Sequence, residues 1–227
     1  MFRLVPVLLA ATLVLVCGCR GSATTTPIDS VPPSGVDAAT PLTDLLQRLA
    51  VTDEVTTGYA RTEFRLWTDD DGDGCNTREE VLIAQSLELP TVTGVCDVVR
   101  GAWFSEYDGL RIVTPSEVEI DHVVPLAEAW ESGASSWSPA RREAYANDLG
   151  VPWALIAVSA ASNRAKGASD PTEWLPPRSA DLCPYLAAWI GVKSRWGLSV
   201  DADERVTLAD LVRQCPDTRL AVPPAPT

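Results

Sequence analysis

The chain has one histidine, His122, and an aspartate, Asp121, directly precedes it. A neutral imidazole can accept a proton from water near pH 7, and a carboxylate oxygen can bind a hard divalent cation. Aspartate followed by histidine is a common pair, and a packed histidine is the ordinary alternative. The pair therefore indicates catalysis only if further polar groups reach the same place.

Polar groups of a suitable kind follow later in the chain, at Asn163 and Lys166. Because these residues lie about one helical turn apart, a helix would place the amide and the ammonium group on one face. An amide oxygen suits a magnesium-like ion, and an ammonium group suits a phosphate. With Asp121 and His122, they predict a metal site beside a free imidazole and a phosphate-binding cation.

The elements that must position these groups follow from the apolar pattern. β-Branched residues alternate over 118–124 and an apolar run fills 153–159, which predicts two strands, the first ending before Pro125. A helix is expected from Ala160, and another at 139–148 has proline in its first turn. Further helices are expected at 37–51, 78–87, 182–196 and 201–215.

Three short segments in this order resemble the HNH (ββα-metal) nuclease motif in its Asp-His, Asn, Asn form. They are 121–126 (Asp-His-Val-Val-Pro-Leu), 146–148 (Ala-Asn-Asp) and 163–166 (Asn-Arg-Ala-Lys). The pattern is similar to that of secreted HNH proteins related to the C-terminal domain of GmrSD-type restriction enzymes, as are Arg142, the Trp-Leu-Pro-Pro segment at 174–177 and the last cysteine pair. The resemblance runs from about Tyr59 to Cys215. It implies an α+β fold with a ββα-metal core, additional helices and disulfide staples.

The resemblance also implies a role for each matching residue. Asp121 and Asn163 would hold one divalent metal, Mg²⁺ with Mn²⁺ as the alternative, and His122 would be the general base that takes a proton from water. Asn147 would pin a loop and help to orient this base. The water attacks phosphorus in line while the metal polarises the phosphate, which is the chemistry of an endonuclease acting on DNA, with RNA as the alternative substrate.

Cations and a third metal ligand would complete such a site. The candidate phosphate contacts are Lys166, Arg164 and Arg142. Solvated surface cations are the alternative reading of both arginines. Asn163 stands where the common motif has a second metal-binding histidine, so the third ligand is left open between Asp148, Glu128 and water. The net charge of −13 predicts weak, salt-sensitive binding of nucleic acid, with the metal supplying much of the attraction.

An acidic run at 69–74 is a second candidate metal site. It fits the EF-hand pattern D-x-D-x-D-G-x5-E, whose oxygen ligands hold Ca²⁺. The ligand positions are Asp69, Asp71, Asp73 and Glu80. Against calcium, the loop is single, Cys75 is a disulfide candidate, and Asn76 stands where such loops carry an apolar residue. An acidic, solvated turn is the alternative.

The N-terminus predicts an exported protein. Arg3, the apolar run at 4–16 and the following Cys-Gly-Cys are typical of a signal peptide at 1–18, whose cleavage frees Cys19 for lipid attachment. The expected product is a cell-surface lipoprotein held at the membrane by this anchor, with a soluble secreted protein as the alternative. The Thr-, Ser-, Pro- and Gly-rich residues 19–36 predict a flexible tether.

The remaining cysteines suit an oxidising compartment. We favour the pairs Cys75–Cys96 and Cys183–Cys215. Each pair closes a short loop, and the absence of a close C-x-x-C spacing disfavours a zinc site. One nuclease-like domain is expected at 37–215, because the apolar fraction of 46% is ample for a core. A proline-rich tail at 216–227 is expected to be disordered.

Two functions of different classes fit these features. The first is an exported, metal-dependent HNH endonuclease with nucleic acid as its partner, and no protein partner can be inferred. The second is a calcium-binding surface lipoprotein with an inactive nuclease-like fold. The eight tryptophans could stack on bases, but core packing is the better interpretation for most of them.

Overall fold

The structure is a computed structural model that describes residues 39–226, all of which belong to one structural unit. The expected signal peptide, Cys19 and the tether lie outside the described residues. The α-helices are α1 (Leu42–Arg48), α2 (Thr77–Ala84), α3 (Leu126–Glu131), α4 (Pro139–Ala146), α5 (Ala160–Lys166), α6 (Leu182–Trp196) and α7 (Ala202–Leu211). The strands are β1 (Thr40–Pro41), β2 (Thr91–Thr93), β3 (Asp97–Arg100), β4 (Trp103–Phe104), β5 (Arg111–Ile112), β6 (Val118–His122), β7 (Leu155–Ser159) and β8 (Arg219–Leu220). Short 3₁₀ helices are η1 (Arg61–Glu63), η2 (Pro115–Glu117), η3 (Ala134–Ser136), η4 (Ser179–Asp181) and η5 (Val212–Gln214).

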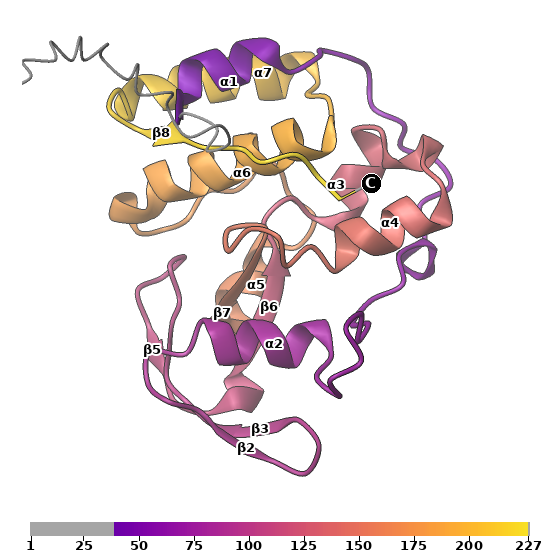
Figure 1. Cartoon of the computed structure of the whole chain (residues 1–227). Helices are drawn as coiled ribbons and strands as arrows, with labels where there is room; N and C mark the ends of the chain where they lie inside the picture. The colour runs from indigo at the N-terminus through magenta and orange to yellow at the C-terminus, as the bar shows by residue number, and fades with distance from the viewer. Residues whose placement is uncertain (1–38, 227) are drawn as a thin grey trace, which may run out of the picture. The chain divides into compact units, whose positions relative to one another are not determined.

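Two antiparallel strands, β6 and β7, form the sheet on which the predicted site residues lie. Val118 pairs with Ser159 at one end, and His122 pairs with Leu155 at the other. Helix α5 follows β7 directly, and both α5 and α2 contact the two strands (Figure 1). The predicted α+β fold is confirmed, with the expected order of strand, insertion, strand and helix.

Alternation along β6 sends neighbouring side chains to opposite faces of this sheet. Val118 and Ile120 pack with Leu82 of α2 in a buried apolar cluster. Glu119 and Asp121 point the other way, toward an asparagine and a lysine of α5. The strand therefore presents its apolar residues to one helix and its acidic residues to the other.

A second buried cluster surrounds α6, most of whose side chains are buried. Helix α1 packs on α6 and α7, and β8 pairs with β1 (Figure 1). The disulfide Cys183–Cys215 joins the first turn of α6 to the residue after η5. The disulfide Cys75–Cys96 joins the segment before α2 to the residue before β3. Both favoured cysteine pairings are confirmed. No helix within residues 39–226 is both long and apolar enough to cross a bilayer.

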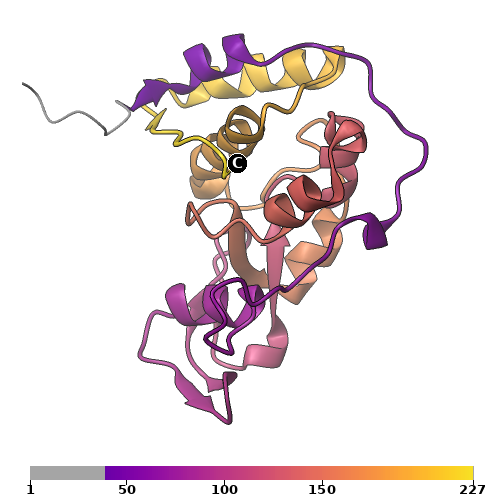
Figure 2. The same ribbon diagram turned by 45° about the vertical axis from the view of Figure 1, so that its right-hand side comes forward.

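The chain between α1 and α2 runs as a largely irregular segment beside α3 and α4 (Figure 2). The backbone N–H of Val55 donates to the Glu131 carbonyl at 3.1 Å, and Trp130 Nε1 donates to the Thr57 carbonyl at 3.0 Å. The sequence of this segment has no helix or strand periodicity, and no element was predicted for it. Hydrogen bonds to distant residues hold the segment in place instead.

Element boundaries differ from the prediction where a local signal was overlooked. The helix expected at 182–196 has those bounds, whereas the one expected at 37–51 begins only after Pro41 and ends before the extended residue Leu49. Helix α3 and the short hairpins β2–β3 and β4–β5 were not predicted. Core packing is confirmed for Trp103, Trp189 and Trp196, which are fully buried.

The segment after η5 has a defined path in the structure, although its composition predicted disorder. Strand β8 pairs with β1, and Arg195 Nη1 donates to the carbonyls of Pro223 at 2.8 Å and Pro224 at 2.6 Å. Proline lacks an N–H but keeps its carbonyl acceptor, so consecutive prolines can still be held by an arginine. Composition alone does not report such a contact.

Replacing Cys183 and Cys215 together by Ser should lower the free energy of unfolding by about 3–4 kcal/mol, because the crosslink restricts the unfolded chain. The joined residues are 32 apart in sequence, and those of Cys75–Cys96 are 21 apart, so the second pair should show a similar but slightly smaller loss. Urea unfolding under non-reducing conditions measures both values. An unchanged unfolding midpoint in either double variant would contradict the expectation.

Candidate functional site

A cavity of about 340 Å³ lies between the end of β6, the start of α3 and helix α5. Its lining includes Asp121, His122 and Asn163, the residues for which the resemblance implied metal binding and base catalysis. The other polar groups of the lining belong to Tyr59, Arg61 and Arg164. A larger cavity of about 660 Å³ beside α6 is mostly apolar and contains none of these residues.

His122 is buried at the end of β6, and its ring is held through one nitrogen. Nε2 lies 2.9 Å from the carbonyl oxygen of Ala146. A carbonyl can only accept, so Nε2 must carry the hydrogen in this contact. The lone pair of the neutral ring is then on Nδ1, which makes Nδ1 the proton acceptor.

The surroundings of His122 favour its neutral form. The pKa of His122 is lowered from 6.5 to about 4. Burial is the main cause, the positive charges of Arg61 and Lys166 act in the same direction, and the hydrogen bond to the Ala146 carbonyl opposes them. The imidazole is therefore unprotonated at neutral pH without needing a partner on Nδ1.

Asp121 is buried against α5 and holds an ion pair with Lys166. Lys166 Nζ lies 2.8 Å from Oδ2, and the Tyr107 hydroxyl donates to the same oxygen at 2.6 Å. Burial raises the pKa of Asp121, and the Lys166 ammonium opposes this rise. The Lys166 bond to Oδ1 is longer, 3.1 Å, so Oδ1 keeps a lone pair for a further ligand.

Lys166 differs from its predicted role as a phosphate contact. Its side chain is fully buried, and Nζ also donates to the carbonyl of His122 at 3.1 Å. Since α5 packs on β6, a lysine on its inner face meets the carboxylate of the strand instead of solvent. Lys166 therefore orients Asp121 and is not available to a phosphate.

Asn163 and Arg164 share a partner that the prediction missed, Glu119. Asn163 Nδ2 donates to Oε2 of Glu119 at 2.9 Å, while Arg164 Nε and Nη2 donate to Oε1 at 3.0 and 2.6 Å. With Nδ2 engaged, the amide oxygen of Asn163 is left as an acceptor. The signal for Glu119 was present, because it lies two residues before Asp121 on the same face of a strand.

Asn147 does not contact His122 through its side chain but holds a neighbouring segment. Its Oδ1 accepts from the backbone N–H of Thr68 at 3.1 Å and from Thr77 Oγ1 at 2.9 Å. Its Nδ2 donates to the carbonyl of Arg65 at 2.8 Å. The residue thus fixes the chain on both sides of residues 66 and 67.

Three further candidates lie away from the cavity. Arg142 is buried and donates to the carbonyl and the carboxylate of Glu63, so it joins α4 to η1 and does not face the cavity, contrary to its predicted role as a phosphate contact. Asp148 is paired with Arg195 at 2.7 Å. Glu128 is paired with Lys193 at 2.7 Å. Neither carboxylate belongs to the lining of the His122 cavity.

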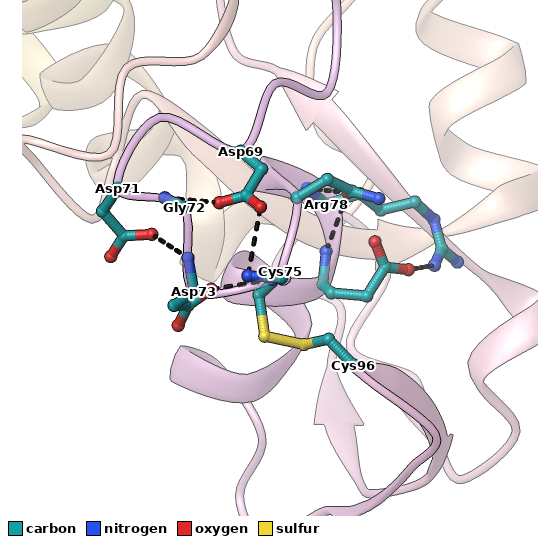
Figure 3. Close-up of a disulfide and its surroundings, with 10 residues drawn as sticks. Asp69, Asp71, Gly72, Asp73, Cys75, Arg78 and Cys96 are labelled. Atoms are coloured by element: carbon teal, nitrogen blue, oxygen red, sulfur yellow. Dashed lines mark hydrogen bonds and ion pairs between the residues drawn. A yellow bond between two sulfur atoms is a disulfide. The ribbon is translucent and has the colours of Figure 1, made fainter.

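The acidic loop before α2 gathers its carboxylates next to a disulfide (Figure 3). Asp69 accepts from the backbone N–H groups of Gly72 and Gly74, at 2.8 and 3.0 Å, and Asp73 accepts from that of Cys75 at 2.7 Å. Ligand atoms of Asp69, Asp71 and Asp73 lie within 4.8 Å of one another. Burial raises the pKa of Glu80, and the neighbouring aspartates raise it further.

Two more groups of carboxylates in the described part of the chain have the spacing of metal ligands. They are Glu54, Glu128 and Glu131, and Asp170, Asp201 and Glu204. Lys193 lies between the two groups and is 2.6 Å from Glu204, so a buried ammonium already compensates part of this charge. Burial raises the pKa of Glu204 to about 7, and the charge of Lys193 opposes the rise.

Comparison with known proteins gives two matches. The family described as GmrSD restriction endonucleases, C-terminal domain, matches residues 76–211. A protein of Arthroderma benhamiae, described as an uncharacterized secreted protein, is 41% identical over 191 residues, which cover 84% of this chain and 92% of that protein. No solved structure matches the chain significantly.

The metal-free folded protein should show a pKa of about 4 for His122, against 6.5 when unfolded. Folding favours the neutral ring, so its contribution to stability is present above pH 6.5 and is lost as the pH falls through 4. The full loss is about 3 kcal/mol, at about 1.4 kcal/mol per pKa unit. NMR titration of the one imidazole measures the pKa.

The linkage has an independent check in urea unfolding at pH 7 and pH 5. Wild type should lose stability between these values relative to His122→Asn, which has no imidazole to protonate. A midpoint near pH 6.5 in the titration, or equal pH dependence of the two proteins, would show that burial does not control the ring.

Proposed function

The chain belongs to the family of the C-terminal domain of GmrSD restriction endonucleases, a nuclease-related family, and we propose that it is an HNH-type endonuclease. It hydrolyses phosphodiester bonds of nucleic acid, DNA in the first place and RNA as the alternative. One observation carries the proposal: Asp121, Asn163 and a neutral His122 line the same cavity.

In this proposal His122 is the general base. Its Nε2 donates to Ala146, so Nδ1 takes the proton of the attacking water as the new bond to phosphorus forms. The ring then becomes an imidazolium beside the carbonyl of Ala146, which stabilises the positive charge through the existing hydrogen bond. A low pKa before the reaction means that the base starts in its active form at neutral and mildly acidic pH.

The oxygen atoms of Asp121 and Asn163 fit one hard divalent cation. Asp121 Oδ1 keeps an acceptor position, and the bond from Asn163 Nδ2 to Glu119 orients the amide so that its oxygen is the free end. Mg²⁺ commonly uses one or two protein ligands and keeps several waters, which suits so small a donor set; Mn²⁺ is the alternative. The chemistry supplied by the bound cation is charge stabilisation at the phosphate and on the leaving oxygen.

Two arginines at the cavity are the phosphate contacts of this proposal. Arg164 has a side chain that is 75% exposed, and Arg61 also lines the cavity from the segment before α2. Both can reach a phosphate from the solvent side, whereas Lys166 and Arg142 are buried. With a net charge of −13 over the whole chain, we expect binding to be weak and to weaken further as salt rises.

The proposed place of action is outside the cytoplasm. Two disulfides suit an oxidising compartment, and the relative from Arthroderma benhamiae is described as secreted. We extend the proposal to a lipid anchor at Cys19, which would hold the enzyme at a membrane surface. A soluble secreted form is the alternative for the same compartment.

We further propose that the acidic loop binds Ca²⁺ as a second, separate metal site. Asp69, Asp71 and Asp73 converge, and their negative charge adds to the effect of burial in raising the pKa of Glu80. A bound cation would relieve this repulsion. Calcium binding here is compatible with nuclease activity, and it is the main function if the His122 cavity is inactive.

His122→Ala should lower the rate of plasmid cleavage by about 10²–10⁴-fold, the usual contribution of a general base. No other imidazole in the chain can replace it. The measurement is conversion of supercoiled plasmid over a series of Mg²⁺ and Mn²⁺ concentrations, repeated with chelator. Equal cleavage by both proteins, or cleavage that the chelator leaves unchanged, would refute the mechanism.

Asp71→Asn should abolish calcium uptake measured by isothermal titration calorimetry. Asp70→Asn is the matched control, because it makes the same charge change at a neighbouring position that is not a ligand in the loop pattern. Uptake that is equal in the two variants would rule out this loop as the calcium site.

A further inference from the structure

We infer that Trp67 is a positioning residue that fixes the plane of the His122 imidazole, a role that rests on the proposed function of His122 as a base. Trp67 has φ of 56°, and it is the one non-glycine residue among residues 39–226 with a positive φ. A bulky side chain in this region is strained, so the surrounding structure must hold it there.

Core packing accounts for only part of the surroundings of Trp67. Trp103, Trp189 and Trp196 are fully buried, whereas Trp67 is partly buried and packs against the apolar cluster beneath α2. A strained backbone at a partly exposed residue suggests that the direction of the side chain matters more than its burial.

The indole of Trp67 lies along the imidazole of His122. The ring centroids are 5.8 Å apart, and the planes differ by 27°. The Tyr145 ring is also nearly parallel to His122, at 6.4 Å and 19°. Flat neighbours of this kind restrict tilting of the imidazole away from an orientation roughly parallel to their planes.

Asn147 holds the backbone on both sides of Trp67. Its amide nitrogen donates to the carbonyl of Arg65 and its amide oxygen accepts from the N–H of Thr68. The carbonyl of Thr68 is in turn held by the N–H and hydroxyl of Thr77, both at 2.9 Å. These hydrogen bonds on both sides hold Trp67 in its strained backbone conformation.

The adjacent residues 146 and 147 thus constrain the same ring in two ways. The Ala146 carbonyl fixes its edge through Nε2, and Asn147 fixes its face through Trp67. A hydrogen bond at one nitrogen still permits the imidazole to turn about that contact. The indole of Trp67, stacked on the imidazole, prevents this rotation. The direction of the Nδ1 lone pair is then set before substrate binds, as general-base catalysis requires.

The test separates the indole from the backbone strain. Trp67→Gly removes the ring and tolerates the positive φ, Trp67→Phe restores a flat ring, and Trp153→Gly removes a tryptophan that lines the larger apolar cavity. NMR of the metal-free proteins reports on the one imidazole. The nuclear Overhauser contacts from Hδ2 and Hε1 of His122 to its other neighbours should be lost or rearranged in Trp67→Gly as the imidazole becomes free to turn, and should be kept in the other two variants.

Kinetics on plasmid supply the second readout. Trp67→Gly should lower kcat by about 10²-fold with KM unchanged, as expected for a misplaced base, and Trp67→Phe should recover most of the loss. A purely structural role would lower stability without this kcat effect or its rescue. Circular dichroism checks folding, and Trp67→Leu replaces Trp67→Gly if the latter does not fold.

Unchanged Overhauser contacts of the His122 ring in Trp67→Gly, an unchanged kcat, or a Trp67→Phe variant as impaired as Trp67→Gly would overturn the inference. Failure of the proposed function looks different, because wild type would then cleave no nucleic acid with any metal. The Overhauser contacts would still decide whether Trp67 positions the ring.

Discussion

The buried ion pair between Lys166 and Asp121 is the constraint on which the candidate site depends. Both side chains are almost completely withdrawn from water, and Nζ and Oδ2 are 2.8 Å apart. Loss of either partner would leave an isolated charge in the interior, which is far more costly than the absence of the pair. Because the pair joins α5 to β6, it also fixes the helix that carries Asn163 relative to the strand that ends in His122.

Around this pair the structure buries the imidazole of the candidate site and exposes its arginine. His122 is buried and neutral, whereas Arg164 is exposed and forms an ion pair with Glu119. Tyr107 and the carbonyl of His122 complete the hydrogen bonds of the ion pair. The buried imidazole of His122 therefore lies next to the solvent-exposed guanidinium of Arg164. The protein as a whole carries a strongly negative net charge.

The sequence predicted the members of the site better than their contacts. Residue type and order were enough to group Asp121, His122 and Asn163, and strand and helix periodicity located β6, β7 and α5. Neither residue order nor periodicity shows whether the side chain of Lys166 faces solvent or the protein interior. Lys166 turned inward because a carboxylate lies on the facing strand, a tertiary fact that no local pattern contains.

The irregular segment between α1 and α2 was the least predictable part for a related reason. Arg61 lines the cavity and Trp67 stacks on His122. No periodic element places them there, because hydrogen bonds to residues far away in the sequence hold this segment. Likewise, Arg142 matched the family pattern and still serves the fold, because its guanidinium meets Glu63 of the same segment. Sequence spacing predicts which side chains share a face within a helix or a strand. It makes no such prediction for an irregular segment.

The bonds of Asn147 also determine when the site can exist during folding. Its partners Arg65 and Thr68 are 82 and 79 residues away, and closing loops of this size costs chain entropy that local helices do not incur. A chain that has paired β6 with β7 but has not yet docked residues 65–68 has Asp121 and His122 in place, but the indole of Trp67 does not yet lie beside the imidazole. The candidate site is therefore complete only once this closure has formed, and formation of the ββα core alone does not complete it.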